Sequence, residues 1–213
     1  MDSGCTDIMK NFLYSEEYKK TEVIGLDLDG TLYDEFEFIN QIYRNITHIY
    51  SDNKDKKEDI LYYMLSRWLE KGSSYAKIFS ETKERFDLVE VFEEQALNLF
   101  RSYEPDLKLS SRIKFMLDKF KKDGKKIFLL TDGRKSLQDK KINALGIRSY
   151  FELIIIAEDY QKPNPYYSKS IKAHFTEYNN IVYIGDRERD KEFATKSGFK
   201  FVNINCMNPN LRD

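Results

Sequence analysis

The stretch VIGLDLDGTL, residues 23–32, decides how the rest of the chain is interpreted. Its first part, residues 23–28, is largely apolar and has the length of one β-strand. The strand leads into an acidic turn, in which Asp27 is followed by Asp29 and Gly30. What this turn can do depends on what the other strands of the chain place beside it.

Four more apolar runs of strand length follow in the second half of the chain, and helical patterns separate them. This alternation predicts a parallel sheet with right-handed crossovers. Because the strands are continuously apolar, helices are expected to cover both faces of the sheet. The predicted strands are residues 127–130, 153–156, 181–184 and 201–204, and the predicted helices are residues 113–120 (with Ser110 or Ser111 as the N-cap), 135–145, 166–175 and 191–197.

Residues 35–103 interrupt the alternation with a segment that we interpret as helical throughout. Apolar side chains recur at the three- and four-residue spacing of a helix face within residues 39–50, 61–68 and 89–103. Breaks are expected at residues 51–55 and 72–74, which predicts a small antiparallel bundle with short loops. Residues 1–20 are polar and irregular, with one short helix expected near residues 14–19.

The composition excludes several classes of protein and site. Lys and Arg number 35 and Asp and Glu number 36, so no net charge draws the chain to nucleic acid or to an acidic membrane surface. No apolar run has the length of a membrane span, and residues 1–20 lack the apolar centre of a secretory signal, so we expect a cytoplasmic protein. The two cysteines, Cys5 and Cys206, make no zinc knuckle or disulfide framework. The only histidines, His48 and His174, lie in predicted helices, which excludes a metal site built mainly from histidine.

Polar residues of a particular kind follow four of the predicted strands. Ligands of open parallel sheets bind beyond the carboxyl ends of the strands, so these residues are expected to converge on one site. Clustered carboxylates repel one another unless a cation joins them, and oxygen ligands without His or Cys favour Mg²⁺. A lysine in such a site can balance the charge of a bound phosphate. The residues are Asp27 and Asp29; Thr131, Asp132 and Gly133; Lys162; and Gly185, Asp186 and Asp190.

These residues resemble the motifs of the haloacid dehalogenase-like hydrolase superfamily. Residues 27–32, DLDGTL, are similar to its first motif, Thr131 to its second, Lys162 to its third, and Asp186 with Asp190 to its fourth, in the same order and strand context. The helical segment is similar to the C1-type cap of that family. The resemblance covers about residues 21–205. It implies an α/β fold with a Rossmann-like core at residues 21–34 and 104–207, an inserted all-helical cap at residues 35–103, and an N-terminal extension at residues 1–20.

The resemblance also implies an enzyme, a Mg²⁺-dependent phosphoric monoester hydrolase that forms an aspartyl-phosphate. In the roles carried over from the family, Asp27 attacks phosphorus, which a carboxylate can do as a nucleophile. Asp29 protonates the leaving oxygen and then activates water. Thr131 and Lys162 hold the phosphoryl oxygens.

The same resemblance assigns the metal and substrate contacts. Mg²⁺ is expected to be held by Asp27, the backbone carbonyl of Asp29 and Asp186, with Asp190 bonded directly or through water. The residues expected at the substrate are Gly30, Asp132 and Gly133.

Two departures from the family pattern concern specificity. Asp132 stands where many members carry Asn, and it is expected either to face a substrate hydroxyl or to pair with Arg134. Arg187 and Arg189 stand where small or amide residues are frequent. They are expected either to pair at the surface with Glu188 and Glu192 or to contact the substrate.

The expected substrate is a small phosphorylated metabolite, such as a sugar phosphate, a nucleoside monophosphate or a phosphoglycolate-like acid. Arg67, Lys71 and Tyr75 are candidate contacts from the helical segment, with ordinary bundle surface as the alternative for each. The chain is expected to be a monomer or dimer. A phosphomutase of the same superfamily and a catalytically silent module that binds phosphorylated ligands or a protein remain alternatives. Asp27 and Asp29 together argue against the silent module, because binding alone needs no acid two residues from the nucleophile.

Overall fold

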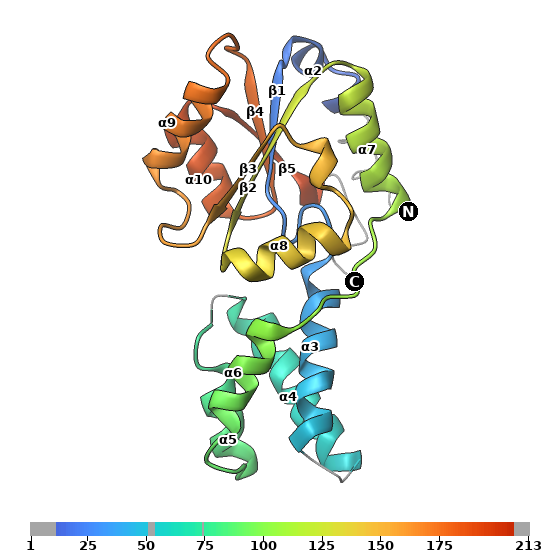
Figure 1. The fold of residues 1–213 in the computed structure, drawn as a ribbon, viewed down its shortest axis with the longest axis vertical. Helices are drawn as coiled ribbons and strands as arrows, with labels where there is room; N and C mark the ends of the chain where they lie inside the picture. The colour runs from blue at the N-terminus through green and yellow to red at the C-terminus, as the bar shows by residue number, and fades with distance from the viewer. Residues whose placement is uncertain (1–11, 51–53, 74, 207–213) are drawn as a thin grey trace. The chain divides into compact units, whose positions relative to one another are not determined.

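The computed structural model describes residues 12–50, 54–73 and 75–206, and the chain divides into two compact units (Figure 1). One unit consists of the described residues within Met1–Asp34 and Leu107–Asp213, and it contains a β-sheet with flanking helices. The other consists of the described residues within Glu35–Asp106, whose regular elements are helices.

The first unit is built on a parallel five-stranded sheet in the order β3-β2-β1-β4-β5. The strands are β1 (Val23–Leu26), β2 (Lys126–Asp132), β3 (Leu153–Ala157), β4 (Ile181–Gly185) and β5 (Lys200–Asn203). The α/β fold with a Rossmann-like parallel sheet, predicted from the alternation of strands and helices, is therefore confirmed. The first strand in the chain is the central strand of the sheet.

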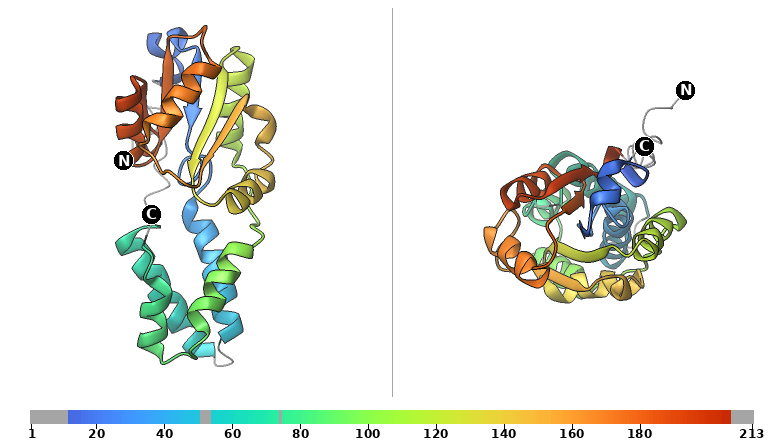
Figure 2. Two further views of the ribbon diagram at one scale, coloured as in Figure 1. Left: turned by 60° about the vertical axis from the view of Figure 1, so that its left-hand side comes forward. Right: turned by 90° about the horizontal axis from the view of Figure 1, so that it is seen from above.

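Helices lie on both faces of this sheet (Figure 2). Helices α9 (Pro165–His174) and α10 (Glu188–Ser197) cover one face, and α7 (Ser111–Lys122) and α8 (Lys135–Ala144) lie on the other. On the first face, Phe128 and Tyr183 of the sheet form an apolar core with Ile171 of α9 and Phe193 of α10. Burial of such side chains at about 25 cal/mol per Å² is the main stabilising contribution to the sheet.

The middle of the sheet contains two aromatic rings where β1 has no side chain. Gly25 is paired with Phe128 on one side and with Tyr183 on the other. The two rings stack with centroids 6.1 Å apart and 28° between their planes. A Cβ atom on Gly25 would lie 2.2 Å from the Phe128 ring and 2.6 Å from the Tyr183 ring. Glycine is therefore required at this position by the space that the rings occupy.

Several helix starts follow local capping signals. Ser110 Oγ accepts a hydrogen bond from the N–H of Ile113 at 3.3 Å, so Ser110 rather than Ser111 caps α7. Asn164 caps α9, whose first residue is a proline. The short helix α2 (Glu16–Lys20) begins after Ser15, close to the predicted residues 14–19.

The helical unit contains α3 (Glu35–Tyr50), α4 (Lys54–Lys71), α5 (Ile78–Phe86) and α6 (Phe92–Ser102). Its helices bury Ile42, Met64 and Phe92 completely. The prediction of one helical pattern over residues 89–103 is wrong at its start, because Val89 lies outside any helix and is 61% exposed. The separate helix α5 was not predicted. It ends at Asp87, which takes a left-handed backbone conformation (φ 49°) without the glycine that usually signals such an end.

Candidate functional site

The register of the sheet brings three of the predicted strand ends together. Leu26, the last residue of β1, is paired with Leu129 of β2 and with Ile184 of β4. The backbone N–H of the next residue, Asp27, donates to the carbonyl of Ile184 at 3.0 Å. Asp27 therefore leaves the sheet between the ends of β2 and β4, where parallel sheets bind their ligands.

Lys162 comes from the loop after β3 and is the centre of a buried polar cluster. Its Nζ lies 2.7 Å from Asp27 Oδ1 and 2.5 Å from Asp190 Oδ1. It also lies 3.1 Å from the hydroxyl of Tyr183. Burial alone lowers the pKa of Lys162, but the facing carboxylates of Asp27 and Asp190 raise it well above its ordinary value. Lys162 is therefore a permanent positive charge in the site.

The Asp27 carboxyl group is almost completely buried, with 4% of the residue exposed. Burial raises its pKa, and so do the neighbouring charges of Asp190 and Asp29, while Lys162 lowers it; the net pKa is about 7. A carboxylate in this setting carries a charge that few water molecules stabilise. The ammonium group of Lys162, 2.7 Å from Oδ1, takes the place of that water as the partner of the charge.

Three carboxylates lie close enough together to hold one cation. Oxygen atoms of Asp27, Asp186 and Asp190 lie within 4.8 Å of one another. Asp186 Oδ1 is buried and has no hydrogen-bond partner. Burial raises the pKa of Asp186, although Arg187 lies 3.4 Å from its other oxygen, Oδ2, and opposes this rise. The oxygen-only donor set and this unpartnered oxygen fit a hard divalent cation such as Mg²⁺.

Asp190 is the least available of the three carboxylates. Its Oδ1 accepts from Lys162, and its Oδ2 accepts from the backbone N–H of Arg187 at 3.1 Å. Both oxygens of this completely buried residue are therefore already engaged. This arrangement favours contact with a cation through water over a direct bond. The backbone carbonyl of Asp29 stays a predicted ligand.

The side chain of Asp29 is held by a second group of polar residues. Lys141 Nζ lies 2.6 Å from Asp29 Oδ1, which also accepts from the hydroxyl of Tyr33. Gln138 Nε2 donates to Asp29 Oδ2 at 2.7 Å. Burial raises the pKa of Asp29, but Lys141 and the hydrogen bonds outweigh burial and lower the pKa.

Thr131 lies at the end of β2 and is 1% exposed. Its Oγ1 is 2.6 Å from the same Gln138 Nε2, so one amide group joins Thr131 to Asp29. The structure thus brings Asp27, Asp29 and Thr131 to the same edge of the sheet together with Lys162.

The residues predicted to contact the substrate have well-defined places. Gly30 (φ 75°) passes so close to Asp186 that a Cβ atom would lie 2.4 Å from its Oδ2. Gly133 (φ 130°) donates its backbone N–H to the carbonyl of Ala157 at 3.3 Å. Asp132 Oδ1 accepts from the backbone N–H of Lys162 at 2.9 Å, so Asp132 holds the loop that carries the lysine.

For Asp132 and for the two arginines, the ion pairs offered as one of two alternatives differ from those that the structure has. Asp132 pairs with Arg189, with Oδ2 at 3.6 Å from Nη1, whereas Arg134 is exposed. Arg187 pairs with Asp186 at 3.4 Å. The expected partners, Glu188 and Glu192, pair instead with Lys191 and Lys196, one turn away on α10. The two arginines thus face the site, because α10 starts at Glu188, about one turn earlier than predicted.

Sequence reasoning missed Gln138 and Lys141. A signal for them exists, because Leu137 and Ile142 mark the buried face of α8, and both polar residues fall on that face. A polar side chain at an inward position must find a partner. It also missed Tyr183, an aromatic core residue whose hydroxyl reaches both Lys162 and the carbonyl of Leu130.

The contacts expected from the helical unit are largely satisfied within that unit. Arg67 pairs with Glu81 at 2.8 Å, and Glu81 also accepts from the hydroxyl of Tyr75. Lys71 pairs with Glu70 at 2.8 Å. Tyr75 also lines a cavity of about 150 Å³, beside the indole of Trp68.

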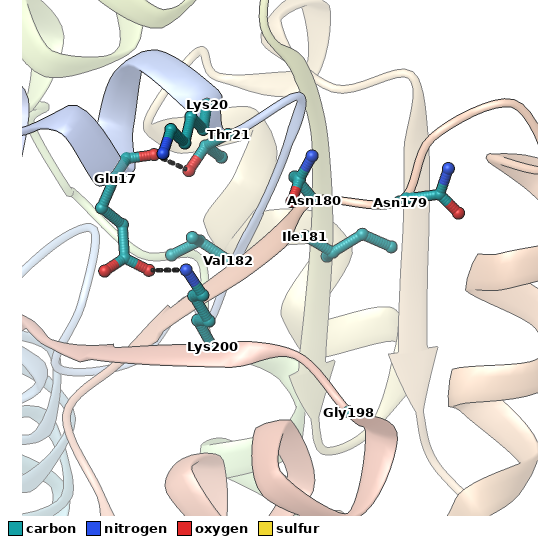
Figure 3. A pocket seen from close by; sticks show the side chains of 9 residues that line it. All are labelled: Glu17, Lys20, Thr21, Asn179, Asn180, Ile181, Val182, Gly198 and Lys200. Carbon is teal, nitrogen blue, oxygen red and sulfur yellow. Dashed lines mark hydrogen bonds and ion pairs between the residues drawn. The ribbon is translucent and has the colours of Figure 1, made fainter.

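A smaller pocket of about 70 Å³ lies at the opposite edge of the sheet, near the start of β4 (Figure 3). Glu17 and Lys200 pair with each other across it at 2.9 Å, and Thr21 donates to the carbonyl of Glu17. It is therefore separate from the site around Asp27. None of the described helices is long and apolar enough to cross a membrane.

Comparison with known proteins adds family information to this geometry. A family model described as haloacid dehalogenase-like hydrolase matches residues 24–204. The chain is 25% identical over 208 residues to the glyceraldehyde 3-phosphate phosphatase of Methanocaldococcus jannaschii. The matched region covers 89% of this chain and 86% of that protein.

Solved structures share the fold at lower identity. A hydrolase from Streptococcus pneumoniae TIGR4 is 20% identical, with a TM-score of 0.63, over 91% of this chain and 97% of that one. A magnesium-bound hydrolase from Bacillus subtilis is 16% identical, with a TM-score of 0.65, over 87% of each chain.

Proposed function

Because the chain belongs to the family of haloacid dehalogenase-like hydrolases, we propose that it is a phosphatase that hydrolyses a small phosphorylated metabolite through Asp27. The observation that carries the proposal is the position of Asp27 in the site. This buried carboxylate has the ammonium group of Lys162 2.7 Å from one oxygen and Asp29 two residues away. A nucleophile, a fixed positive charge and an acid–base group are thus provided within one small site.

In the first step, a carboxylate oxygen of Asp27 attacks phosphorus and the bond from phosphorus to the ester oxygen breaks. Asp29, whose carboxylate Lys141 and Gln138 keep ionised, takes the proton of the phosphate monoester monoanion and passes it to the departing oxygen. Thr131 and Lys162 bind the phosphoryl oxygens and offset the charge that they carry. The alcohol leaves, and the phosphoryl group remains on Asp27 as an acyl phosphate.

In the second step, Asp29 takes a proton from a water molecule whose oxygen attacks phosphorus. The bond from phosphorus to Asp27 breaks, and inorganic phosphate leaves. The ionised form of Asp29, which Lys141 and Gln138 favour, is the form that this step requires. A general base of this kind typically contributes about 10²- to 10⁴-fold to the rate.

A divalent cation fits beside Asp27. Asp27 and Asp186 would hold it directly, with the Asp29 carbonyl as a further ligand and Asp190 acting through water. Bound there, Mg²⁺ would offset the negative charge of the phosphate and of the clustered carboxylates.

The phosphatase of Methanocaldococcus jannaschii, similar along most of both chains, supports a small phosphorylated metabolite as the substrate. In this proposal the helical unit takes the part of the C1-type cap, which closes over the substrate and excludes water.

Phosphate release from a panel of phosphorylated metabolites, with Mg²⁺ and with chelator, tests this function. We expect Asp27→Asn to retain the fold and to abolish turnover, because the amide is nearly isosteric but not nucleophilic. Asp118→Asn, a change of a surface carboxylate on α7, is the matched control and should turn over normally. A tenth of normal activity in Asp27→Asn would exclude the covalent route. Isomerised product without free phosphate would indicate a mutase, and no reaction on any compound would favour a binding module.

A further inference from the structure

Helix α8 presents two buried polar side chains to the site, and nothing in the motifs assigns them a role. Gln138 is 2% exposed and Lys141 is 4% exposed. They are three residues apart and so lie on the same face of the helix. Burial of an amide and an ammonium group costs free energy unless each is paired, so their partners indicate what they do.

Lys141 binds one oxygen of the Asp29 carboxylate. Its Nζ lies 2.6 Å from Oδ1, and the side chains are only 6% and 12% exposed. The hydroxyl of Tyr33 donates to the same oxygen, and the Tyr33 ring lies 5.9 Å from Lys141 Nζ. Oδ1 is therefore held from two directions in a setting with little water.

Gln138 binds the other oxygen and extends the group to Thr131. Its Nε2 is 2.7 Å from Asp29 Oδ2, 2.6 Å from Thr131 Oγ1 and 3.1 Å from the carbonyl of Asp132. Three acceptors around one nitrogen fix the orientation of the amide, because its oxygen would be repelled there. With Oγ1 accepting from Gln138, the Thr131 hydroxyl keeps its own hydrogen for another acceptor.

We propose that Gln138 and Lys141 are positioning residues for the reaction: Lys141 fixes the direction of the Asp29 carboxyl group, and Gln138 aligns Asp29 with Thr131. This inference rests on the phosphatase function proposed above. Asp29 must meet first the leaving oxygen and then a water molecule, so the direction of its carboxyl group has to be fixed. Misplacement of an acid–base group by about 1 Å can cost on the order of 100-fold in rate.

The test compares Lys141→Met, Asp29→Asn and the double variant by rapid-quench measurement of phosphoenzyme formation and hydrolysis. An alkyl phosphate and p-nitrophenyl phosphate serve as substrates, because only the alkyl leaving group depends strongly on the proton. Lys135→Met is the matched control, since Lys135 lies on the same helix and forms an exposed pair with Asp139.

We expect Lys141→Met to slow phosphoenzyme formation from the alkyl ester about 10-fold or more, with a smaller loss for the aryl ester. Phosphoenzyme hydrolysis should slow for both. In the Asp29→Asn background, the same change should alter these rates by less than about 2-fold, because Lys141 acts through Asp29. A full additional loss in that background, or an equal loss with both esters, would overturn the inference.

Gln138→Met separates the second role from the first. We expect it to raise KM for both esters about 5-fold through Thr131, the equivalent of one hydrogen bond. An unchanged KM with both esters would refute this part.

If Lys141→Met does not fold, Lys141→Arg decides the matter. It keeps the charge but displaces the carboxyl group, so the alkyl ester should again react more slowly than the aryl ester. Normal rates with both would overturn the inference. An inactive wild-type protein would instead count against the phosphatase function itself.

Discussion

Lys162 is the residue on which the charge balance of the site depends. It contacts carboxylates from two different elements, Asp27 after β1 and Asp190 in α10. Its third contact, the hydroxyl of Tyr183, belongs to a ring in the apolar core. The packing of the sheet and the position of the ammonium group are therefore linked through one side chain.

Replacing Lys162 with Ala leaves both carboxylates buried without their cation. We expect kcat/KM to fall about 100-fold or more. The free energy of unfolding should decrease by on the order of 3 kcal/mol, because a buried pair has lost one partner. Lys162→Arg keeps the charge, so its kcat/KM and its free energy of unfolding should each fall less than those of Lys162→Ala. Steady-state kinetics and urea unfolding check this, with the exposed Lys169→Ala as control. Normal kinetics in Lys162→Ala would make it an ordinary loop residue.

At the residue scale, the sequence identifies a site residue where that residue belongs to a motif. It is less informative about which side chain pairs with which. Asp27 and Lys162 could be named because each follows an apolar strand. The pairing of Asp132 with Arg189 could not, because it depends on where α10 begins. No motif in the sequence distinguishes Lys141 from the exposed lysines of other helices, because its burial depends on how α8 packs.

At the scale of elements, the central strand tolerates no side chain at Gly25. Gly25→Ala forces a methyl group into the space of the Phe128 and Tyr183 rings, and such overpacking costs about 1–3 kcal/mol. We expect a loss of stability of this size in urea unfolding. Gly25→Ala combined with Phe128→Leu should recover part of the loss relative to the sum of the single changes. A strictly additive double variant would show that the rings do not limit this site.

A second prediction concerns the contact between α2 and α7. Asp123, just after α7, accepts from Lys119 Nζ and from the Tyr18 hydroxyl, both at 2.7 Å. These hydrogen bonds, that of Lys119 first, lower the pKa of Asp123. The side chain is 28% exposed, so the expected contribution is about 1 kcal/mol or less.

The direction of the pH effect follows from that lowered pKa. The unfolded state binds the proton more readily, so the contribution is complete above the ordinary aspartate pKa and is lost as the pH falls through the lower folded value. Asp123→Asn should therefore be less stable than wild type near neutral pH, with the difference shrinking in acid. Unfolding midpoints across the pH range check this, and a difference that grows in acid would contradict it.

The elements themselves were predicted unequally. Buried parallel strands are continuously apolar and short, so β2, β3 and β4 could be located within about two residues. The helix α5 could not, because only nine residues separate its start from a left-handed aspartate that carries no standard signal. The sequence pattern therefore does not separate the apolar residues of α5 from the rest of the helical segment.

At the scale of the whole molecule, we expect the acidic cluster to make stability depend on divalent cations. A cation that binds only the folded chain stabilises it by about 2.7 kcal/mol at one hundred times its Kd. We expect calorimetry to give a higher Tm in Mg²⁺ than in chelator. Asp186→Asn should lose most of this shift, because it removes the carboxylate with the unpartnered oxygen. Asp118→Asn should keep it, and an equal shift in both variants would place the cation elsewhere.

The position of β1 in the sheet also has a consequence for biosynthesis. β1 is the central strand but the first to leave the ribosome, and its neighbours β2 and β4 come after the entire helical unit. β2 follows about 100 residues later, which at typical elongation rates is on the order of 5–20 s. During this interval an apolar strand has both edges unpaired, a state prone to aggregation. Nascent chains arrested before Lys126 should therefore bind chaperones that recognise exposed apolar segments, and chains arrested well beyond β4 should release them.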